Sequence, residues 1–555
     1  MKYLLSMLIM ISISINLFCQ GSLLLVGGGA ESEGGWSDAP FSWMVTKAEN
    51  GVIINIDTDE ASDWYTDYFI SLGADNQSQA VSIPAEEANN EAIFELLSNA
   101  DGIFIEGGDQ SSYLNAWKNT MVETAIETVF ESGGVIGGTS AGLAVLGEIV
   151  FSAEAGSAYP EDVAHNPYNE YLTFEDDFLE ILPNTIIDTH FHERGRMGRL
   201  MPMLARRVAD NSADSLLAIG VENSSALAID SLLVGKIFGE SVTFLRFNPD
   251  FDFICEPGRP LTASFFLDQF LDSAKVDLND FSVLANGAWM NEVNMGDPPD
   301  NYYNAVSLDG NEESCMEYGD FTANNIFADP DAWWYGDIFF TEGEGLLPAS
   351  MIITAIWDNS DYFANVWTAA IMNSAQNDFT YSILMDSNSV VEINQQGSLT
   401  TSDLTYLIDN NEITHSGSNS YGISGIVGGK IYCMGPGDGF ELNNNTSSGE
   451  ELTQNTPMIR CYPNPIILAS NDEKAGDRDL KIIFSIKESQ SVRINIFNLK
   501  GKLINCIDHN FYKAGQKIVN WNLKDKQNKV VGTGIYFCKL KTKEKSIVSK
   551  ILVIR

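Results

Sequence analysis

Small residues surround one serine at the end of an apolar run. Residues 133–142 read GGVIGGTSAG, and the helix-like stretch 143–148 follows them. A nucleophile on a sharp strand-to-helix turn needs small neighbours, because the backbone there is strained and the side chain must project free of the sheet. Ser140 meets this requirement. We expect it to act as a nucleophile, with the amides of Ala141 and Gly108 as the oxyanion hole.

Glycine-rich loops of this kind also bind phosphate groups. Such loops end in Gly-Lys-Ser or Gly-Lys-Thr, which this segment lacks. The chain is also strongly acidic and would repel phosphate. The nucleophile is therefore the favoured interpretation.

A serine nucleophile requires a base, and the chain offers five histidines: His165, His190, His192, His415 and His509. His190 is favoured because it lies in the segment 186–199, IIDTHFHERGRMGR, which reads as a strand that opens into a basic loop and a helix. For His192 we expect a structural role.

The same segment permits a metal site, because Asp188, His190 and His192 alternate along a strand and so point to one face. In metal-dependent amidohydrolases, a D-x-H-x-H pattern lies on the first strand of the barrel, and further His and Asp ligands come from later strands. Only His415 and His509 follow in this chain. We therefore expect neither a metal ion nor a cofactor.

The third member of the site should be an acid that orients His190. Glu222 follows the apolar stretch 216–221 and is the first choice. Asp188 ranks second, because a neighbour two positions away on a strand faces the same side as His190 and does not lie behind the ring.

Five of the 13 basic residues before position 451 fall in one short segment; they are Arg194, Arg196, Arg199, Arg206 and Arg207. Guanidinium groups bind carboxylates through paired hydrogen bonds, so Arg194, Arg196 and Arg199 are candidates for binding a substrate carboxylate beside the base. The alternative is that these arginines neutralise acidic residues of the chain itself.

The elements around these residues alternate between strands and helices. Short apolar runs at 22–26, 52–57 and 103–105 are separated by helix-like stretches such as 91–99 and 122–131. This order predicts an α/β fold with a doubly wound, mostly parallel sheet over residues 20–262. The loops after Val26, Ile105 and Ile136 should then meet at the carboxyl edge, where such sheets bind ligands.

Taken together, these segments resemble the cyanophycinases, a serine peptidase family related to aspartyl dipeptidase. The matching pieces stand in the family's order and are 26–29 (VGGG), 107–110 (GGDQ), 137–142 (GGTSAG), 188–199 and 219–222 (IGVE). The resemblance implies a flavodoxin-like fold of the class I glutamine amidotransferase type. It makes Ser140 the nucleophile and His190 the base, and it places Gln110, Asp188, Arg194, Arg196 and Arg199 in the substrate pocket.

The resemblance also implies an activity. Cyanophycinases are serine exopeptidases that hydrolyse cyanophycin, a poly-aspartate bearing arginine side chains, to β-aspartyl-arginine. The family usually has an acidic pair before a Thr-Ala step, whereas residues 222–226 here read ENSSA. The sequence leaves open whether Glu222 or Asn223 occupies the position of the catalytic acid. If it is Asn223, which a count back from Ala226 favours, activity is weakened or lost unless Glu222 substitutes for it.

Charge separates the chain into two parts. Residues 1–450 hold 13 basic and 67 acidic residues (13 − 67 = −54), and residues 451–555 hold 19 and 9 (19 − 9 = +10). The acidic part excludes nucleic acid and anionic membranes as partners and suits a substrate rich in arginine and aspartate. Residues 1–19 read as a signal peptide, and no later apolar run is long enough to cross a membrane.

The region 263–442 offers few motifs. Residues 218–230 (AIGVENSSALAID) and 382–394 (SILMDSNSVVEIN) nevertheless share a strand, an acidic turn and a second strand, each after a helix-like stretch. We interpret the region as an α/β segment containing a degenerate partial repeat of the first domain, without a second catalytic serine. The alternative is a chance likeness between two β-turn-β units.

Residues 443–458 read as a polar linker, and 459–555 read as the strands of a β-sandwich. With its basic charge and terminal position, this last segment resembles the type IX secretion sorting domains of Bacteroidetes. The resemblance implies export through the periplasm, contact with the secretion machinery, and a secreted or cell-surface protein.

Two other functions remain open at the level of sequence. One is a serine peptidase that cleaves other Asp-containing peptides. The other is a catalytically inactive surface-binding protein that retains the fold, as the altered turn at 222–226 allows.

Overall fold

The computed structural model describes two compact units, residues 1–445 and 446–555. The residues that it describes are 21–29, 31–211, 216–287, 319–324, 339–342, 347–353, 367, 370–371, 381–386, 389–394, 397–418, 424–442, 459–462, 466–467, 480–486, 489–498, 502–513, 515–527, 529–543 and 546–554. The predicted signal peptide and linker lie outside these residues.

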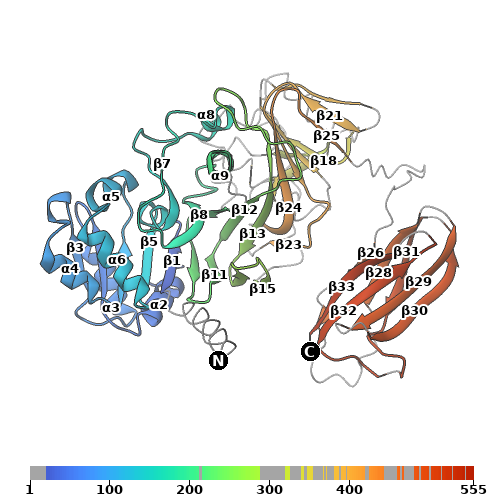
Figure 1. The fold of residues 1–555 in the computed structure, drawn as a ribbon, viewed down its shortest axis with the longest axis horizontal. Coiled ribbons are helices and arrows are strands. Elements are labelled where there is room, and N and C mark those ends of the chain that lie inside the picture. The colour runs from blue at the N-terminus through green and yellow to red at the C-terminus, as the bar shows by residue number, and fades with distance from the viewer. Residues whose placement is uncertain are drawn as a thin grey trace, which may run out of the picture. The chain divides into compact units, whose positions relative to one another are not determined.

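The first unit begins with a parallel sheet (Figure 1). Its parallel part has the order β1-β5-β4-β2-β3. The strands are β1 (Ser22–Val26), β2 (Ile53–Asp57), β3 (Gln79–Ser82), β4 (Gly102–Ile105) and β5 (Val135–Thr139). Beyond β1 the sheet continues with antiparallel strands β10 (Ser225–Ile229), β11 (Val234–Gly239), β14 (Ala274–Asp277) and β15 (Val283–Asn286).

Helices cover both faces of this sheet because its buried strands are apolar on both sides. Leu24 and Val26 pack with the apolar residues of α2 (Asp38–Lys47) and α3 (Asp63–Ser71). Leu23 and Leu25 point the other way and pack with α4 (Glu91–Ser98), α5 (Gln110–Trp117) and α6 (Met121–Glu131). The predicted doubly wound arrangement is confirmed.

A second sheet, which the sequence did not predict, follows the serine turn. Its order is β17-β16-β18-β19-β22-β24-β13-β12-β9-β8-β6-β7, and β23 (His415–Ser418) also pairs with β24. Its first strands are β6 (Gly147–Phe151), β7 (Phe174–Glu175), β8 (Leu182–Asp188), β9 (Leu217–Val221), β12 (Ser241–Phe247) and β13 (Ala263–Leu271). The remaining strands are β16 (Gly319–Asn324), β17 (Phe339–Glu342), β18 (Leu347–Ile353), β19 (Tyr381–Met385), β22 (Thr405–Asp409) and β24 (Ser424–Met434). Helix α9 (Met197–Asn211) packs on this sheet through Leu200, Met201 and Leu204.

The sheet runs without a break across position 262, where the sequence placed a boundary. β12 and β13 pair as antiparallel neighbours, and β13 pairs with β24 on its other edge. The described residues between 263 and 442 therefore share a core with the preceding strands and belong to the same compact unit. The prediction that residues 263–442 take no part in catalysis stays a prediction.

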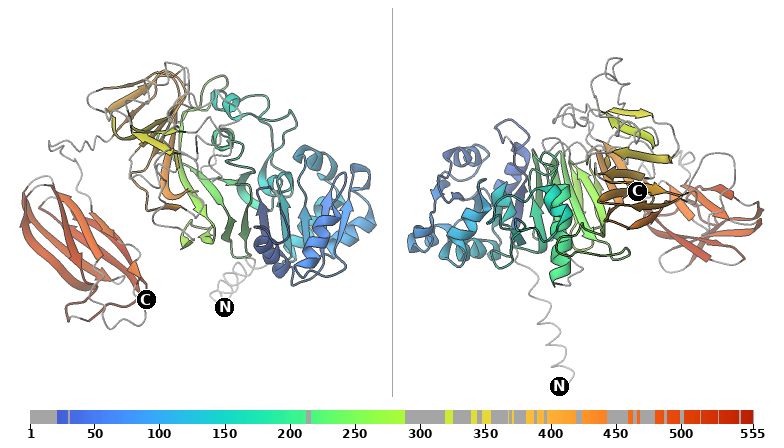
Figure 2. Two further views of the ribbon diagram at one scale, coloured as in Figure 1. Left: turned by 180° about the vertical axis from the view of Figure 1, so that it is seen from behind. Right: turned by 90° about the horizontal axis from the view of Figure 1, so that it is seen from above.

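The second unit consists of strands in two layers, shown from behind and from above in Figure 2. One sheet has the order β26-β28-β31 and the other β27-β33-β32-β29-β30. The strands are β26 (Ile459–Tyr462), β27 (Ile466–Ile467), β28 (Leu480–Ile486), β29 (Gln490–Asn498), β30 (Leu503–Tyr512), β31 (Gly515–Trp521), β32 (Gly534–Lys541) and β33 (Ser546–Ile554). Ile482 and Phe484 of one sheet and Ile494 of the other meet in a single core, which confirms the predicted all-β sandwich.

Among the described residues, no helix is long and apolar enough to span a membrane.

Candidate active site

Ser140 stands on a strained turn between β5 and the short helix α7 (Ala141–Ala144). Its backbone has φ 52° and ψ −116°, a combination that non-glycine residues rarely adopt. The turn closes because its neighbours are glycines: a Cβ on Gly142 would lie 2.2 Å from the Ile105 carbonyl oxygen, and one on Gly138 would lie 2.3 Å from the Gly142 carbonyl oxygen. The need for small residues, inferred from the sequence, thus has a direct steric cause.

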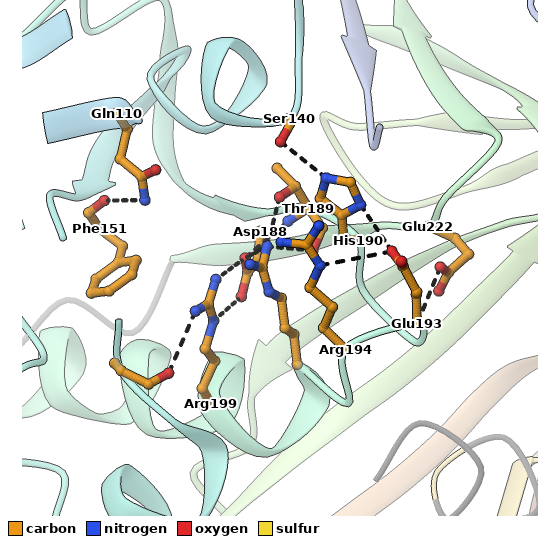
Figure 3. Close-up of polar contacts among 12 residues, drawn as sticks. Gln110, Ser140, Phe151, Asp188, Thr189, His190, Glu193, Arg194, Arg199 and Glu222 are labelled. Carbon is orange, nitrogen blue, oxygen red and sulfur yellow. Dashed lines mark hydrogen bonds and ion pairs between the residues drawn. The ribbon is translucent and has the colours of Figure 1, made fainter. Parts of the chain in front are cut away.

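His190 lies within hydrogen-bond distance of the serine (Figure 3). Its Nε2 is 3.0 Å from the Ser140 Oγ. His190 follows the end of β8, and its own backbone has φ 43°. The structure therefore brings together the two residues predicted as nucleophile and base, although they stand beside different sheets.

The loop after β1 aligns the two residues. The Val26 carbonyl accepts the amide of Ser140 at 3.0 Å, and the Gly27 carbonyl accepts the amide of His190 at 2.9 Å. Gly28 has φ +104°, and a Cβ there would lie 2.4 Å from the imidazole Cε1. A side chain at this position would displace the imidazole, which explains the glycines of the VGGG segment.

Two side chains contact the other imidazole nitrogen. The His190 Nδ1 is 2.5 Å from the Asn223 Oδ1 and 2.9 Å from the Glu193 Oε2. Both oxygens accept, so Nδ1 carries the proton and Nε2 faces Ser140 as an acceptor. Burial alone would raise the pKa of Glu193, but the hydrogen bond and charge of His190, with Arg194 and Arg196, hold that pKa below its usual value.

Glu222 has a different position from the one predicted. Its buried carboxylate accepts the backbone amides of Asn223 at 2.7 Å, Glu193 at 3.2 Å and His192. Consecutive residues at the end of β9 point in opposite directions, so Asn223 faces the ring while Glu222 faces the backbone of the 192–193 turn. The assignment of Glu222 as the orienting acid is corrected: it holds the turn that carries Glu193. Glu193 was not predicted as a site residue, although it lies in the His190 segment.

The arginine cluster is built around one buried carboxylate. Asp188 accepts from the Arg199 Nε at 2.7 Å, the Arg199 Nη2 at 2.6 Å and the Arg196 Nη1 at 3.2 Å. Burial would raise the pKa of Asp188, but the guanidiniums of Arg199 and Arg196 outweigh it and lower that pKa. Asp188 and Arg199 are thus paired with each other, and their predicted role in substrate binding stays a prediction.

The alternative interpretation is that the arginines neutralise acidic residues of the chain itself. It also applies to Arg206 and Arg207. Arg206 pairs with Asp210 at 2.7 Å, and Arg207 pairs with Asp176. Arg194 differs from these. The Arg194 side chain is 51% exposed and its Nε lies 3.8 Å from Glu193.

Arg196 is buried among other charged side chains. Burial and the charge of Arg199 lower its pKa to about 9, against the opposing effect of Asp188. Three guanidiniums therefore face a site that contains the carboxylates of Asp188 and Glu193. A ligand carboxylate placed beside Arg194 and Arg196 would compensate this excess of positive charge.

Gln110 begins α5 beside the serine turn. Its Nε2 donates to the Phe151 carbonyl at 3.3 Å (Figure 3). A Cβ on Gly107 would lie 3.3 Å from the Ser140 Cβ, so the 107–110 loop passes directly against the nucleophile. The roles of Gln110 and of the Gly108 and Ala141 amides stay predictions.

The second histidine of the segment is buried away from the serine. The His192 Nε2 lies 2.6 Å from the Gln269 Oε1, and burial lowers the His192 pKa to about 4. Among the described residues, no group of three or more His, Cys, Asp or Glu side chains has an arrangement that could hold a metal ion.

Two buried carboxyls near the site should make stability depend on pH. Burial raises the pKa of Glu222 to about 7, and burial followed by the charge of Glu222 raises that of Glu240 to about 8. The Glu240 Oε2 is buried without a hydrogen-bond partner in the described part of the chain. A raised folded-state pKa stabilises the fold below the unfolded value, and this stabilisation is lost as the pH rises through the folded value.

Glu240→Gln is therefore expected to raise the melting temperature at pH 8 by ~2–5 °C and to change it little at pH 5. Differential scanning calorimetry from pH 5 to pH 8 measures this, with the exposed Glu154→Gln as the matched control. An equal shift at both pH values would show that Glu240 does not titrate in this range.

The fold and the site together define a serine hydrolase centre: a strained serine at the end of a parallel strand, and a histidine that accepts from its hydroxyl. Residues 23–232 match the model of peptidase family S51, and residues 477–554 match that of the secretion system C-terminal sorting domain. Both predicted resemblances are thus confirmed: that of the N-terminal part to cyanophycinase-type serine peptidases and that of the C-terminal part to secretion sorting domains. Residues 23–232 are similar to family S51 peptidases, and the match to the sorting domain points to secretion or the cell surface.

Individual relatives agree with the family match. The chain is 30% identical over 185 residues to the cyanophycinase of Synechococcus elongatus, covering 33% of this chain and 52% of that protein. It is 26% identical over 194 residues to the cyanophycinase of Geminocystis herdmanii, covering 34% and 68%. The chain thus spans about half the length of the first of these relatives.

One solved structure, a peptidase from an acI-B1 Actinobacterium, matches with a TM-score of 0.33 and 19% identity, covering 47% of this chain and 97% of that one.

Proposed function

We propose that the protein is a secreted serine exopeptidase that hydrolyses cyanophycin to β-aspartyl-arginine. The observation that carries the proposal is the 3.0 Å contact between the Ser140 Oγ and the His190 Nε2 on a strained strand-to-helix turn. The cyanophycinases among the relatives support the substrate.

In this mechanism, the Ser140 Oγ attacks the carbonyl carbon of the scissile bond while His190 takes its proton at Nε2. The backbone amides of Ala141 and Gly108 hold the negative oxygen of the tetrahedral intermediate. His190 then donates the proton to the leaving amine. A water molecule, activated by the same nitrogen, hydrolyses the acyl-enzyme and regenerates Ser140.

The imidazolium formed in each step requires a nearby negative charge. Asn223 occupies the position of the acid in this family's pattern, and its amide oxygen accepts Nδ1–H but carries no charge. Glu193 contacts the same nitrogen and is held ionised by its surroundings. In this proposal Asn223 fixes the tautomer and Glu193 stabilises the imidazolium.

The substrate carboxylate binds beside Arg194 and Arg196, where positive charge is in excess. The Asp188–Arg199 pair supports Arg196 from behind. An aspartyl residue carries the required carboxylate, and this requirement also admits other Asp-containing peptides.

The test is release of β-aspartyl-arginine from purified cyanophycin by the mature chain, with Ser140→Ala as control. Dipeptide release by the wild type alone supports both mechanism and substrate. Absence of release, together with labelling of Ser140 by a fluorophosphonate, would retain the serine peptidase and reject cyanophycin. Asn223 at the acid position favours a binding protein as the second candidate, and failure of both assays would support that candidate.

A further inference from the structure

The strand topology of the second sheet is symmetric about the pair β13 and β24 at its centre. From β13 the order is β12, β9, β8, β6, β7, and from β24 it is β22, β19, β18, β16, β17. The first two steps on each side are antiparallel and the next two are parallel. The outermost pair on each side is antiparallel again. Two halves of one sheet thus repeat a single topology.

A smaller sheet extends the correspondence. In the first half, β10 pairs with β11 and β11 with β14. In the second half, β20 (Val391–Ile393) pairs with β21 (Ser398–Thr401), and β21 with β25 (Gly439–Glu441). The chain visits the corresponding strands in the same sequence order, so chance likeness of a single β-turn-β unit does not account for the pattern.

Equivalent positions in β9, β11 and β14 of the first half and in β19, β21 and β25 of the second are separated by the same number of residues. Leu217 begins β9 and Tyr381 begins β19, and 381 − 217 = 164. Val234 pairs with Asp277, and Ser398 pairs with Glu441, so that 398 − 234 = 164 and 441 − 277 = 164. The register of β6 against β8 shifts after Gly147, and that of β16 against β18 shifts after Gly319. Even an irregularity of the ladder therefore recurs.

The two halves meet at corresponding residues. β13 and β24 are antiparallel, and Phe266 lies opposite Lys430, with 430 − 266 = 164. A two-fold axis through a sheet pairs a strand with its own equivalent in this way, residue against the same residue. We infer that residues 319–441 are a second copy of residues 147–277, and that β24 occupies the place which β13 of another molecule would take in a symmetric dimer.

The second copy keeps an acid but not a catalytic site. Asp386 corresponds to Glu222, since 386 − 222 = 164, and both follow a buried strand. Glu222 accepts backbone amides, whereas Asp386 accepts from the His165 Nε2 at 3.0 Å. In the described residues after 286, no strand corresponds to β1–β5, which carry the serine turn. The described residues therefore carry one serine turn, and the second copy takes the place of a second subunit.

The contact between the copies resembles a protein core. Leu204, Phe265 and Leu267 of the first copy belong to the same buried cluster as Trp367, Tyr406 and Ile431 of the second. The Thr262 Oγ1 donates to the Asp438 Oδ2 at 2.5 Å, and the Gly428 amide donates to the Asp268 Oδ1 at 2.7 Å. Such a contact keeps the β13 edge covered in the isolated chain.

Paired cysteines at the proposed axis test this inference in the full mature chain. Phe266→Cys with Lys430→Cys, in a Cys506→Ser background that removes an exposed thiol, should react with dibromobimane to a fluorescent monomer. Phe266→Cys alone should give no covalent dimer, and Lys430→Cys alone and the Cys506→Ser parent are the matched controls. Analytical ultracentrifugation of the wild type should give the mass of one chain.

If Phe266→Cys alone gives a covalent dimer, β13 pairs with another molecule and the inference is overturned. The same holds if the wild type has a dimeric mass and Phe266→Cys cross-links that dimer. A double variant that stays unlinked would overturn it as well. Fluorophosphonate labelling of each variant separates these outcomes from the proposed function, because Ser140 follows β5 of the first sheet and its reactivity does not depend on the cross-link.

Discussion

Ser140→Ala and His190→Ala should each reduce kcat/KM by about 10⁴–10⁶-fold, and the double variant should be no worse than either single one. The reason is that the two side chains act as one unit. The hydroxyl is a weak nucleophile until Nε2 accepts its proton across the observed 3.0 Å. Steady-state kinetics on a dipeptide-releasing substrate measure the three variants. Additive losses would contradict the shared mechanism.

Both substitutions should leave the fold intact. The serine side chain is short, and its turn is closed by the glycines and by the bond from its own amide to Val26. Equal melting temperatures for wild type and Ser140→Ala are the control. A variant that loses activity and stability together would not support a catalytic role.

Glu193→Gln should reduce kcat by about 10²–10³-fold with a much smaller change in KM. Glutamine keeps the size and can still accept from Nδ1, but it cannot neutralise the imidazolium. Loss of the charge should also make the imidazolium less favourable, so the acidic limb of the kcat/KM profile should move to lower pH. The measurement is the pH–rate profile of both proteins.

The neighbouring amide provides a rescue experiment. Asn223→Asp in the Glu193→Gln background places a carboxylate at 2.5 Å from the same nitrogen and should recover most of the lost activity. Glu222→Gln is the contrasting variant, because it disturbs the 192–193 turn without removing a charge from the ring. Full activity of Glu193→Gln, with an unchanged pH profile, would assign the orienting role to Asn223 alone.

Ser140 and His190 were predictable because short motifs encode their surroundings. The small residues around Ser140 are required by the close approach of the backbone at its turn, and this requirement is visible in the sequence as GGTSAG. The parallel sheet was predictable for a similar reason, since its strands are short apolar runs between helices. Each of these features depends on residues close together in the chain.

The orienting acid was not predictable in the same way. The choice between Glu222 and Asn223 depends on which of two consecutive side chains faces the ring. Glu193 reaches the ring because His190 adopts φ 43° and the chain turns back on itself, held by the Glu222 carboxylate. This arrangement joins segments 30 residues apart and has no pattern of its own in the sequence.

The second sheet was missed for a topological reason. The run at 217–221 has the composition of any buried strand, and only its pairing with β8 and β12 assigns it to a different sheet from β1. The likeness between residues 218–230 and 382–394 pointed to the repeat. Its extent emerges from the strand registers, because side chains of the two copies have diverged while the ladders have kept their spacing.

The most direct test of the account is intact-mass spectrometry of the mature protein after reaction with a fluorophosphonate. The account predicts one adduct per chain on the wild type, located on Ser140 by peptide mapping. It predicts no adduct on Ser140→Ala or His190→Ala. An unlabelled wild type, or labelling that persists without His190, would contradict the claim that Ser140 is an activated nucleophile.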